Sequence, residues 1–411
     1  MPDKQHLTRH VLPCVLMRAG TSKGLFLHRR DLPQNQIDWA PHLISALGSR
    51  GNDPRQIDGV GGGTSTTSKV AVVSPSERPD ADVDFTFVQV AVGKESVDFT
   101  GTCGNISSGV GPFAVQEGLV KPRPGQTQMD VRIFNSNTQR IIVETVEIDE
   151  TGEFEEDGTY NIPGVSTTGS EVKCAFIDPA GSMTGTLFPS GKTQQTLSIQ
   201  PPSSLPDTEP FSVRVTLIDA ANPFVLVDST SISPLLNALP SEDIQHALIE
   251  VIRREGAVAM GLAPTVDVAA HTRGTPKIAL VYPPTFNQAS GELPDIRVQA
   301  YSMGLPHPSL QLTGAVCIAA ALSSPGTVAA ELCAKSTSNW ALPTPERTPS
   351  PPNAIGECKE TEVLIAHSKG VIRVGVVKED RKIRSCAVSR TARRLFEGRV
   401  RYYVDKMYIE C

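Results

Sequence analysis

A stretch rich in glycine and hydroxyl residues ends in a lysine and carries the densest polar signal of the sequence. Residues Gly59–Lys69 read Gly-Val-Gly-Gly-Gly-Thr-Ser-Thr-Thr-Ser-Lys and continue directly into the apolar segment Val70–Val73. Small residues of this kind leave backbone N–H groups open to an anion. A lysine that is partly desolvated at the start of a buried strand has a lowered pKa and can accept a proton. Lys69 is therefore a candidate base, and a lysine that merely reaches solvent from a strand end is the alternative.

A cysteine at the start of a predicted helix is the second candidate for chemistry. Cys103 precedes Gly104 and Asn105, and the helix is expected over Ile106–Glu117. A thiol in this position feels the positive end of the helix dipole, which lowers its pKa and favours the thiolate. The N–H groups of Gly104 and Asn105 would hold a substrate carboxylate. A cysteine that simply fits a crowded glycine-rich turn gives the same pattern.

The second half contains a comparable helix start. Thr313 is expected to cap a small, apolar helix, and the same cap could bind a carboxylate. His307 stands between two prolines, where it is either a ligand-binding donor or an exposed loop histidine. Asn222 precedes Pro223, which makes it a turn residue first and a site candidate second.

Two nucleotide-binding motifs are incomplete. A G-x-G-x-x-G fingerprint that starts at Gly59 would need glycine in place of Thr64, and the spacing after Gly185 is one residue too long for a Walker A loop. We therefore exclude both a Rossmann fingerprint and a P-loop.

Short strands rich in Val, Ile and Phe must position most of these residues. Strands are expected at Val70–Val73, Val83–Val92, Val131–Phe134, Ile141–Ile148, Phe211–Ile218, Lys277–Tyr282, Ile296–Tyr301, Val363–His367 and Val371–Val377. Helices are expected at Trp39–Leu47, Ile106–Glu117, Ser241–Met260, with Ser241 as N-cap, Ala315–Leu322 and Thr327–Ala334. Each half contains one helix so poor in charge that it must be surrounded by protein. This pattern predicts two strand-rich halves, each rolled around a central helix.

The length of 411 residues also favours two domains. The proline-rich stretch Pro201–Pro210 is interpreted as a domain linker, and Pro343–Pro352 as a surface excursion. We expect a first domain over 1–200, with a C-terminal return over 385–411, and a second domain over 210–384.

Composition excludes several classes of protein. Charged residues make up 20% of the chain and the net charge is −6, without a basic block that could neutralise phosphates, so nucleic acid is not expected as a partner. No apolar stretch is long enough to cross a membrane and the first residues are polar, so a cytoplasmic protein without a membrane partner is expected. The 8 cysteines lack a C-x-x-C pair, which disfavours a zinc site and a disulfide framework.

Five segments together resemble the PrpF-like isomerases, which belong to the diaminopimelate epimerase-like superfamily and include 2-methylaconitate, methylitaconate, aconitate and oxalomesaconate isomerases. The segments are Arg18–Gly24, Gly61–Val73, Cys103–Gly109, His307 with Thr313–Cys317, and Ser389–Gly398. The resemblance implies an α/β fold of two similar domains, each a curled sheet or barrel around a central helix, with the active site in the cleft between them. It also implies no cofactor and no metal.

The resemblance further assigns proton transfer to the residues that match Lys69 and Cys103, and leaves open which is base and which is acid. Epimerases of the superfamily carry a second catalytic cysteine at the start of the second central helix, where this sequence has Gln311. A two-thiol epimerase is therefore disfavoured, and Cys317, one helical turn further on, is expected in the core.

The sequence thus predicts a cofactor-independent isomerase of a small unsaturated polycarboxylate of the aconitate or 2-methylaconitate type. The expected substrate-binding residues are Ser22, Thr64, Ser65, Gly104, Asn105, Asn222, His307, Thr313 and Gly314. An oxalomesaconate tautomerase, a methylitaconate Δ-isomerase and a non-catalytic small-acid binding module remain alternatives. The identity of the acid and the oligomeric state, a homodimer included, stay open.

Overall fold

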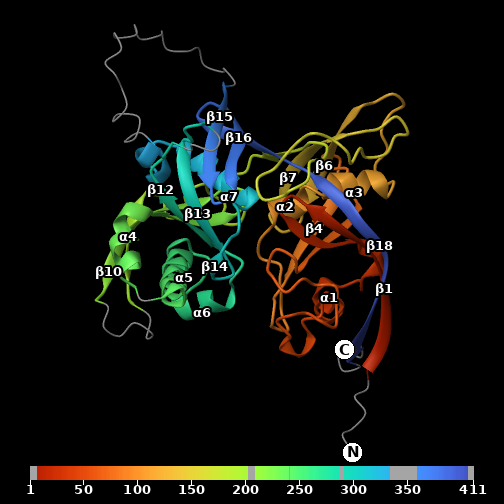
Figure 1. Ribbon diagram of the computed structural model, residues 1–411, viewed down its shortest axis with the longest axis horizontal. Helices are drawn as coiled ribbons and strands as arrows, with labels where there is room; N and C mark the ends of the chain where they lie inside the picture. Colours follow the sequence, from red (N-terminus) through yellow and green to blue (C-terminus); the bar gives the residue numbers. More distant parts are fainter. Residues whose placement is uncertain (1–6, 202–208, 240, 287–290, 334–358, 406–411) are drawn as a thin grey trace, which may run out of the picture. The chain divides into compact units, whose positions relative to one another are not determined.

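The chain forms two compact units in the computed structural model, which describes residues 7–201, 209–239, 241–286, 291–333 and 359–405 (Figure 1). Unit 1 consists of residues 1–174 and 390–411, and unit 2 of residues 175–389. The observed bounds differ from the expected ones, because residues 175–200 belong to unit 2. The proposed linker lies largely outside the described residues, and the strands before and after it pair with each other inside unit 2. The expected excursion at 343–352 also lies outside them.

Unit 1 is built on a curled, mixed sheet. Its strands are β1 (Leu7–Ala19), β2 (Ser22–His28), β3 (Lys69–Pro75), β4 (Val83–Val90), β5 (Val97–Asp98), β6 (Gln128–Asn135), β7 (Arg140–Glu147) and β18 (Ala392–Asp405). β18, β1 and β2 pair antiparallel in that order, β2 and β3 pair parallel, and β3 and β4 antiparallel. β4 then pairs parallel with β6, and β6 antiparallel with β7. β8 (Val172–Ile177) and β17 (Lys382–Arg390) carry the chain across the unit boundaries.

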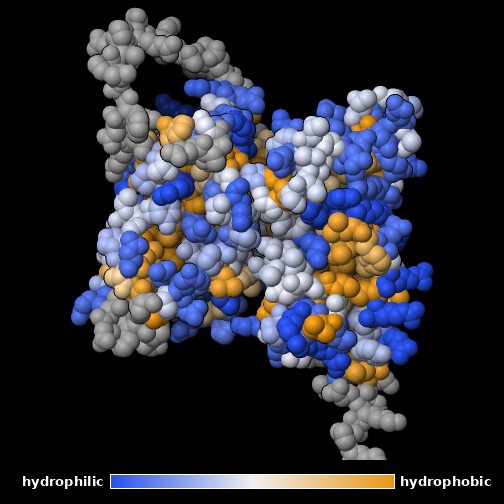
Figure 2. Space-filling view, viewed as in Figure 1, coloured by the Kyte–Doolittle hydropathy of each residue, from blue (hydrophilic) through white to orange (hydrophobic). Residues whose placement is uncertain are grey.

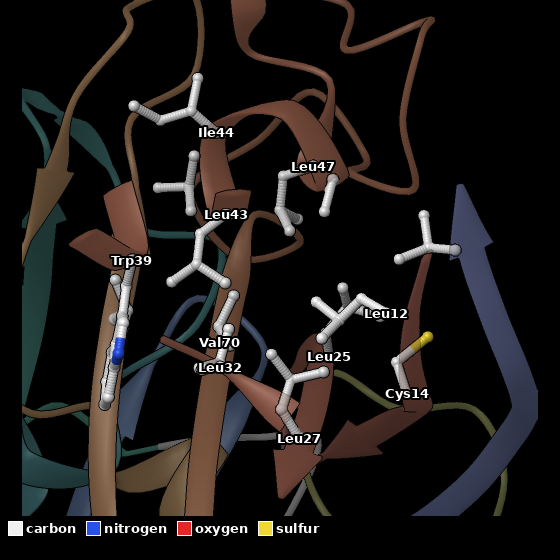
Figure 3. Packing of buried hydrophobic residues seen from close by; sticks show 14 of the residues in the cluster. Leu12, Cys14, Leu25, Leu27, Leu32, Trp39, Leu43, Ile44, Leu47 and Val70 are labelled. Carbon is white, nitrogen blue, oxygen red and sulfur yellow. The ribbon is translucent and has the colours of Figure 1, made fainter. Parts of the chain in front are cut away.

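Helices cover both faces of this sheet. α1 (Trp39–Leu47) packs on one face with Leu12, Leu25 and Val70 in an apolar cluster (Figure 3). On the other face, α2 (Gly104–Ser107) contacts β1 to β4, and α3 (Val110–Gln116) contacts β3, β6 and β7. Every residue of α2 is buried. The single helix expected here is therefore present as two short ones, separated at residues 108–109.

Unit 2 repeats this order of strands. The strands are β9 (Gln195–Ile199), β10 (Phe211–Asp219), β11 (Pro223–Asp228), β12 (Lys277–Tyr282), β13 (Ile296–Ser302), β14 (Leu305–Pro306), β15 (Lys359–His367) and β16 (Gly370–Glu379). β9, β10 and β11 pair antiparallel, β11 and β12 parallel, and β12 and β13 antiparallel. β13 then pairs parallel with β15, and β15 antiparallel with β16. Because the pairings follow the same sequence in both units, the fold is an internal repeat that sequence similarity alone did not establish.

The helices of unit 2 divide between the two faces in the same way. α4 (Ser229–Ala238), α5 (Glu242–Ala259) and α6 (Val266–His271) cover the outer face, where α5 and α6 lie side by side (Figure 1). α7 (Leu312–Leu322) contacts β10, β11, β15 and β16 and is buried from Leu312 to Ala321. Helical turns also occupy residues 328–333.

The predicted fold class, an α/β curled sheet around a central helix in each half, is confirmed. The sheets are open, since no pairing among the described strands joins the two ends of either series. One local prediction is wrong. Thr313 does not cap α7, because Gln311 is the N-cap and Thr313 is the second helical residue.

Apolar surface remains on unit 1. The space-filling view shows it over the β1 and β18 ribbon (Figure 2), where Val11, Leu395 and Phe396 are exposed. No helix among the described residues is long and apolar enough to span a membrane.

Candidate active site

Lys69 opens β3 and is buried, with 6% of its surface exposed. Its Nζ lies 2.5 Å from Oε1 of Gln89 and 5.1 Å from the ring centroid of Phe87. Burial lowers the pKa of Lys69, and the charge of a Cys103 thiolate acts in the opposite direction. The lysine therefore does not simply reach solvent from a strand end, as the alternative interpretation required.

Gln89 fixes the polar environment of this lysine, and sequence reasoning missed it. It stands opposite Lys69 in the β3–β4 register. Its Nε2 donates to the carbonyl oxygens of Ser68 at 2.8 Å and Ser65 at 3.2 Å. Since these bonds occupy the amide nitrogen, the amide oxygen must face the lysine. The pairing depends on strand register, which motif analysis does not supply.

Cys103 is the N-cap residue of α2, in the extended conformation expected of a cap. Its side chain is partly exposed, and its Sγ lies 4.0 Å from Oγ of Ser22 at the start of β2. Ser22 itself is 2% exposed. The structure thus brings together Ser22 and Cys103, and places Cys103 within electrostatic range of Lys69.

Two glycines allow these elements to approach. A Cβ on Gly24 would lie 2.6 Å from the carbonyl oxygen of Lys69 and 3.2 Å from Cδ1 of Ile106 in α2. Gly20 has a φ of +53°, and a Cβ there would lie 2.3 Å from Oδ1 of Asn105. Positions 20 and 24 therefore require glycine, because β2, β3 and α2 come into close contact there.

Asn105 is held by a buried arginine from the end of β17. Arg390 is 3% exposed, and its Nε donates to Oδ1 of Asn105 at 3.1 Å. The Asn105 amide nitrogen donates to Oγ1 of Thr21 at 3.1 Å. Burial lowers the pKa of Arg390 to about 10. Arg390 lies in the family-like segment Ser389–Gly398, but nothing in the sequence connects it to Asn105.

The glycine-rich loop is less directly involved than expected. Thr64 is exposed, and its hydroxyl interacts with those of Thr66 and Thr67 at 3.1 and 2.7 Å. Ser65 contributes its carbonyl oxygen to Gln89. The loop therefore reaches Lys69 through Gln89 and the backbone.

The remaining predicted residues lie in unit 2. Asn222 is fully buried, and its Oδ1 and Nδ2 have no hydrogen-bond partner among the described residues. His307 is only 5% exposed, which excludes the alternative of an exposed loop histidine, and its Nδ1 accepts from the N–H of Ser309 at 3.1 Å. Thr313 is buried, and a Cβ on Gly314 would lie 3.0 Å from Cζ of Phe224.

Cys317 is a core residue, as predicted. It is fully buried, burial raises the pKa of its thiol, and its Sγ lies 2.9 Å from each of the carbonyl oxygens of Ala220 and Asn222. Gln311 occupies the N-cap of α7, the position that Cys103 occupies in α2. Within the described ranges, no cluster of His, Cys, Asp and Glu could hold a metal ion.

A family model described as PrpF protein matches residues 9–345. A putative isomerase YraM of Bacillus subtilis is 38% identical, covering 95% of this chain and 97% of that protein. The 3-methylitaconate isomerase of Eubacterium barkeri is 35% identical over 96% of this chain and 97% of its own. The 2-methyl-aconitate isomerase of Cupriavidus necator is 34% identical, with 96% and 98% covered.

Solved structures agree with the fold. A methylitaconate-delta-isomerase superposes with a TM-score of 0.68 and 32% identity, covering 98% of both chains. A hydroxyproline epimerase from Agrobacterium vitis superposes with a TM-score of 0.51 and 10% identity, covering 96% of this chain and 93% of its own. The second likeness shows the fold alone.

Proposed function

Since this chain belongs to the PrpF family and is an isomerase of small unsaturated acids, we propose that it moves a proton and a double bond on a polycarboxylate of the aconitate or 2-methylaconitate type. Lys69 and Cys103 carry the proton transfers, and no cofactor takes part. The choice of acid follows the names of the relatives, one of which is a (4E)-oxalomesaconate Delta-isomerase.

The buried position of Lys69 is the observation that carries the proposal. An ammonium loses its hydration on burial, which lowers the pKa of Lys69 and favours the neutral amine, the form that can accept a proton. Gln89 offers a neutral oxygen to Lys69 rather than a carboxylate. A carboxylate in that place would stabilise the ammonium and oppose base catalysis. These contacts support Lys69 as the base.

In the proposed reaction, the Lys69 amine takes a proton from the carbon next to an unsaturated carboxylate. The C–H bond breaks, an N–H bond forms, and the electron pair spreads over the carboxylate as a dienolate. The thiol of Cys103 then donates its proton to another carbon of the allylic system, which moves the double bond. A lysine ammonium and a cysteine thiolate remain, and transfer of one proton between them restores the starting state. Against the larger effect of burial, which lowers the pKa of Lys69, a Cys103 thiolate raises it and so helps to hold the ammonium until this transfer occurs.

Hydrogen-bond donors around Cys103 would stabilise the dienolate. The N–H groups of Gly104 and Asn105 and the Ser22 hydroxyl are the candidates, by the same electrostatic principle as an oxyanion hole. Thr64 and Ser65 would contribute through the glycine-rich loop. Asn222, His307, Thr313 and Gly314 remain candidates for carboxylate contacts made by unit 2.

Proton NMR in deuterated water tests the proposal. The enzyme is incubated with cis-aconitate, 2-methylaconitate, methylitaconate and oxalomesaconate, each in a separate sample. We expect at least one acid to isomerise, with deuterium entering the carbon that is reprotonated. Turnover that survives in both Lys69→Met and Cys103→Ala would refute the assigned roles. Binding of these acids by the wild type without any turnover would instead favour a binding module.

A further inference from the structure

Lys277 occupies in unit 2 the place that Lys69 occupies in unit 1. Each lysine is the first residue of a strand, β3 for Lys69 and β12 for Lys277. Each of these strands pairs parallel with the second strand of an antiparallel hairpin, where Lys69 is in register with Gly24 and Lys277 with Phe224. The repeat of strand pairings therefore makes the two lysines structural equivalents.

The surroundings of Lys277 differ from those of Lys69. Lys277 is partly exposed, so its ammonium can meet a solute. Its Nζ lies 3.4 Å from Oγ1 of Thr313 and 6.0 Å from the ring centroid of Phe224. Thr313 is in the first turn of α7, whose leading N–H groups have no acceptor within the helix. A positive charge, a hydroxyl and a helix start thus converge at one place in unit 2.

A buried amide lies beside the strand that pairs with β12. Asn222 lies in the turn that leads into β11, the strand paired with β12. Its side chain is fully buried, and neither Oδ1 nor Nδ2 has a hydrogen-bond partner in the described residues. An unsatisfied buried amide costs free energy, and a ligand oxygen would relieve that cost.

Unit 2 lacks the group that would make this place catalytic. Gln311 stands at the N-cap of the central helix, where unit 1 has Cys103, and its amide neither donates nor accepts a proton in acid–base chemistry. Lys277 also lines a hollow of about 10 Å³ together with Arg273 and Tyr301, which has room for one water molecule. This hollow is therefore too small to hold a polycarboxylate.

We propose that Lys277, with Thr313 and Asn222, forms a carboxylate-binding site in unit 2 that holds anions without transferring protons to them. Its ligand is a carboxylate of a small polycarboxylic acid. The choice of this ligand class rests on the proposed function, whereas the site rests on the strand register and the contacts of Lys277.

Binding of tricarballylate tests this site, because the saturated acid has no double bond to move. Calorimetry is performed on the full chain and on Lys277→Met, Lys277→Arg and, as a control, Lys192→Met, which removes an exposed lysine of the same unit. Loss of a charged hydrogen bond should weaken binding by about 10- to 100-fold in Lys277→Met. Lys277→Arg should retain most of the affinity, and Lys192→Met all of it. Equal affinity of folded Lys277→Met and wild type would overturn the proposal.

A second measurement does not depend on the stability of a variant. Lysines of the wild type are labelled by reductive methylation with ¹³C, and the Lys277 signal is assigned by its loss in Lys277→Arg. Tricarballylate should shift this signal in a saturable way, and an unmoved signal would count against the site. Turnover is assayed on wild type in parallel. If tricarballylate binding depends on Lys277 but no acid is turned over, only the proposed function is refuted. If an acid is turned over but tricarballylate binding does not depend on Lys277, only the carboxylate-binding site in unit 2 is refuted.

Discussion

Burial is the main influence on the charge of Lys69, and it lowers the pKa of the ammonium from its ordinary value of 10.5. Below the folded-state pKa the group is an ammonium and cannot accept a proton, and above it the amine is free. We therefore expect kcat/KM to rise with pH through a midpoint below 10.5. Lys69→Met should reduce kcat by about 10²- to 10⁴-fold, the usual contribution of a positioned acid or base. Lys94→Met, at an exposed lysine of unit 1, is the control.

Gln89 offers a direct test of that pH dependence. In Gln89→Glu a carboxylate would face Nζ of Lys69 and raise the lysine pKa, because it stabilises the ammonium. The rising limb of kcat/KM should move to higher pH, with activity at neutral pH reduced about tenfold or more. Gln299→Glu makes the same change on β13, where the amide donates to the backbone carbonyls of Ala300 and His307 and not to a lysine, and should leave the limb in place. An unmoved limb in Gln89→Glu would remove Lys69 from the role of base.

At the scale of elements, the close contact of β2, β3 and α2 depends on Gly24. Gly24→Ala would place a methyl group 2.6 Å from the Lys69 carbonyl oxygen, and the strands would have to separate. We expect a loss of about 1–3 kcal/mol in the free energy of unfolding, together with a lower kcat. Gly375→Ala on β16 meets its nearest atom at 3.9 Å and should be neutral. Urea unfolding and turnover of the three proteins provide the comparison.

A buried carboxyl joins α3 to β7. Oε2 of Glu144 accepts from the N–H of Gly111 at 2.8 Å, and burial raises the pKa of Glu144 from 4.5 to about 8. Between these values the folded chain retains a proton that the unfolded chain releases, so the free energy of unfolding falls as pH rises. The slope is at most about 1.4 kcal/mol per pH unit. Glu144→Gln should remove this component from the pH dependence of Tm, and Glu147→Gln on the same strand should not.

The sequence predicts an element well when residues close to it in the chain determine its bounds, and poorly when packing against distant segments does. The bounds of α1 and β12 match the expected ones, and Ser241 caps α5 as predicted. β1 and β18 were missed, because the exposed apolar residues Val11, Leu395 and Phe396 disturb the alternation of apolar and polar residues in these strands. The cap of α7 was misplaced, since its N-cap makes no side-chain hydrogen bond and the buried helix is fixed by packing.

The residues of the candidate site also divide into those that their sequence neighbours reveal and those that only distant contacts reveal. Lys69 and Cys103 are recognisable from the residues beside them in the chain. Gln89, Arg390 and Lys277 are not, because their importance comes from strand register and from contacts between distant segments. A single sequence does not show which residues of two paired strands lie opposite each other.

At the scale of the whole molecule, unit 1 is discontinuous, because β18 supplies the partner of β1. A chain that ends at Thr391 should lose the order of unit 1 and all turnover, while the apolar core of unit 2 around β10–β12 persists. Hydrogen exchange is the appropriate measurement, with protection expected to disappear in β1–β4 and to remain in β10–β12. The full chain serves as control. Unchanged protection of β1–β4 in the shortened chain would show that β18 is dispensable.

The pairing of β1 with β18 also determines when unit 1 can complete its fold during synthesis of the chain. Leu7 pairs with Asp405, so at about 5–20 residues per second a ribosome needs roughly 20–80 seconds to deliver the partner of the first strand. During that time unit 2 can be completed, but the outer edge of β1 stays unpaired and could join the edge of another nascent chain. Pro13 and Arg9 lie on that strand, and proline and charge are features that discourage such pairing. In the nascent chain, Pro13 and Arg9 therefore oppose pairing of the β1 edge with another chain until β18 has been synthesised.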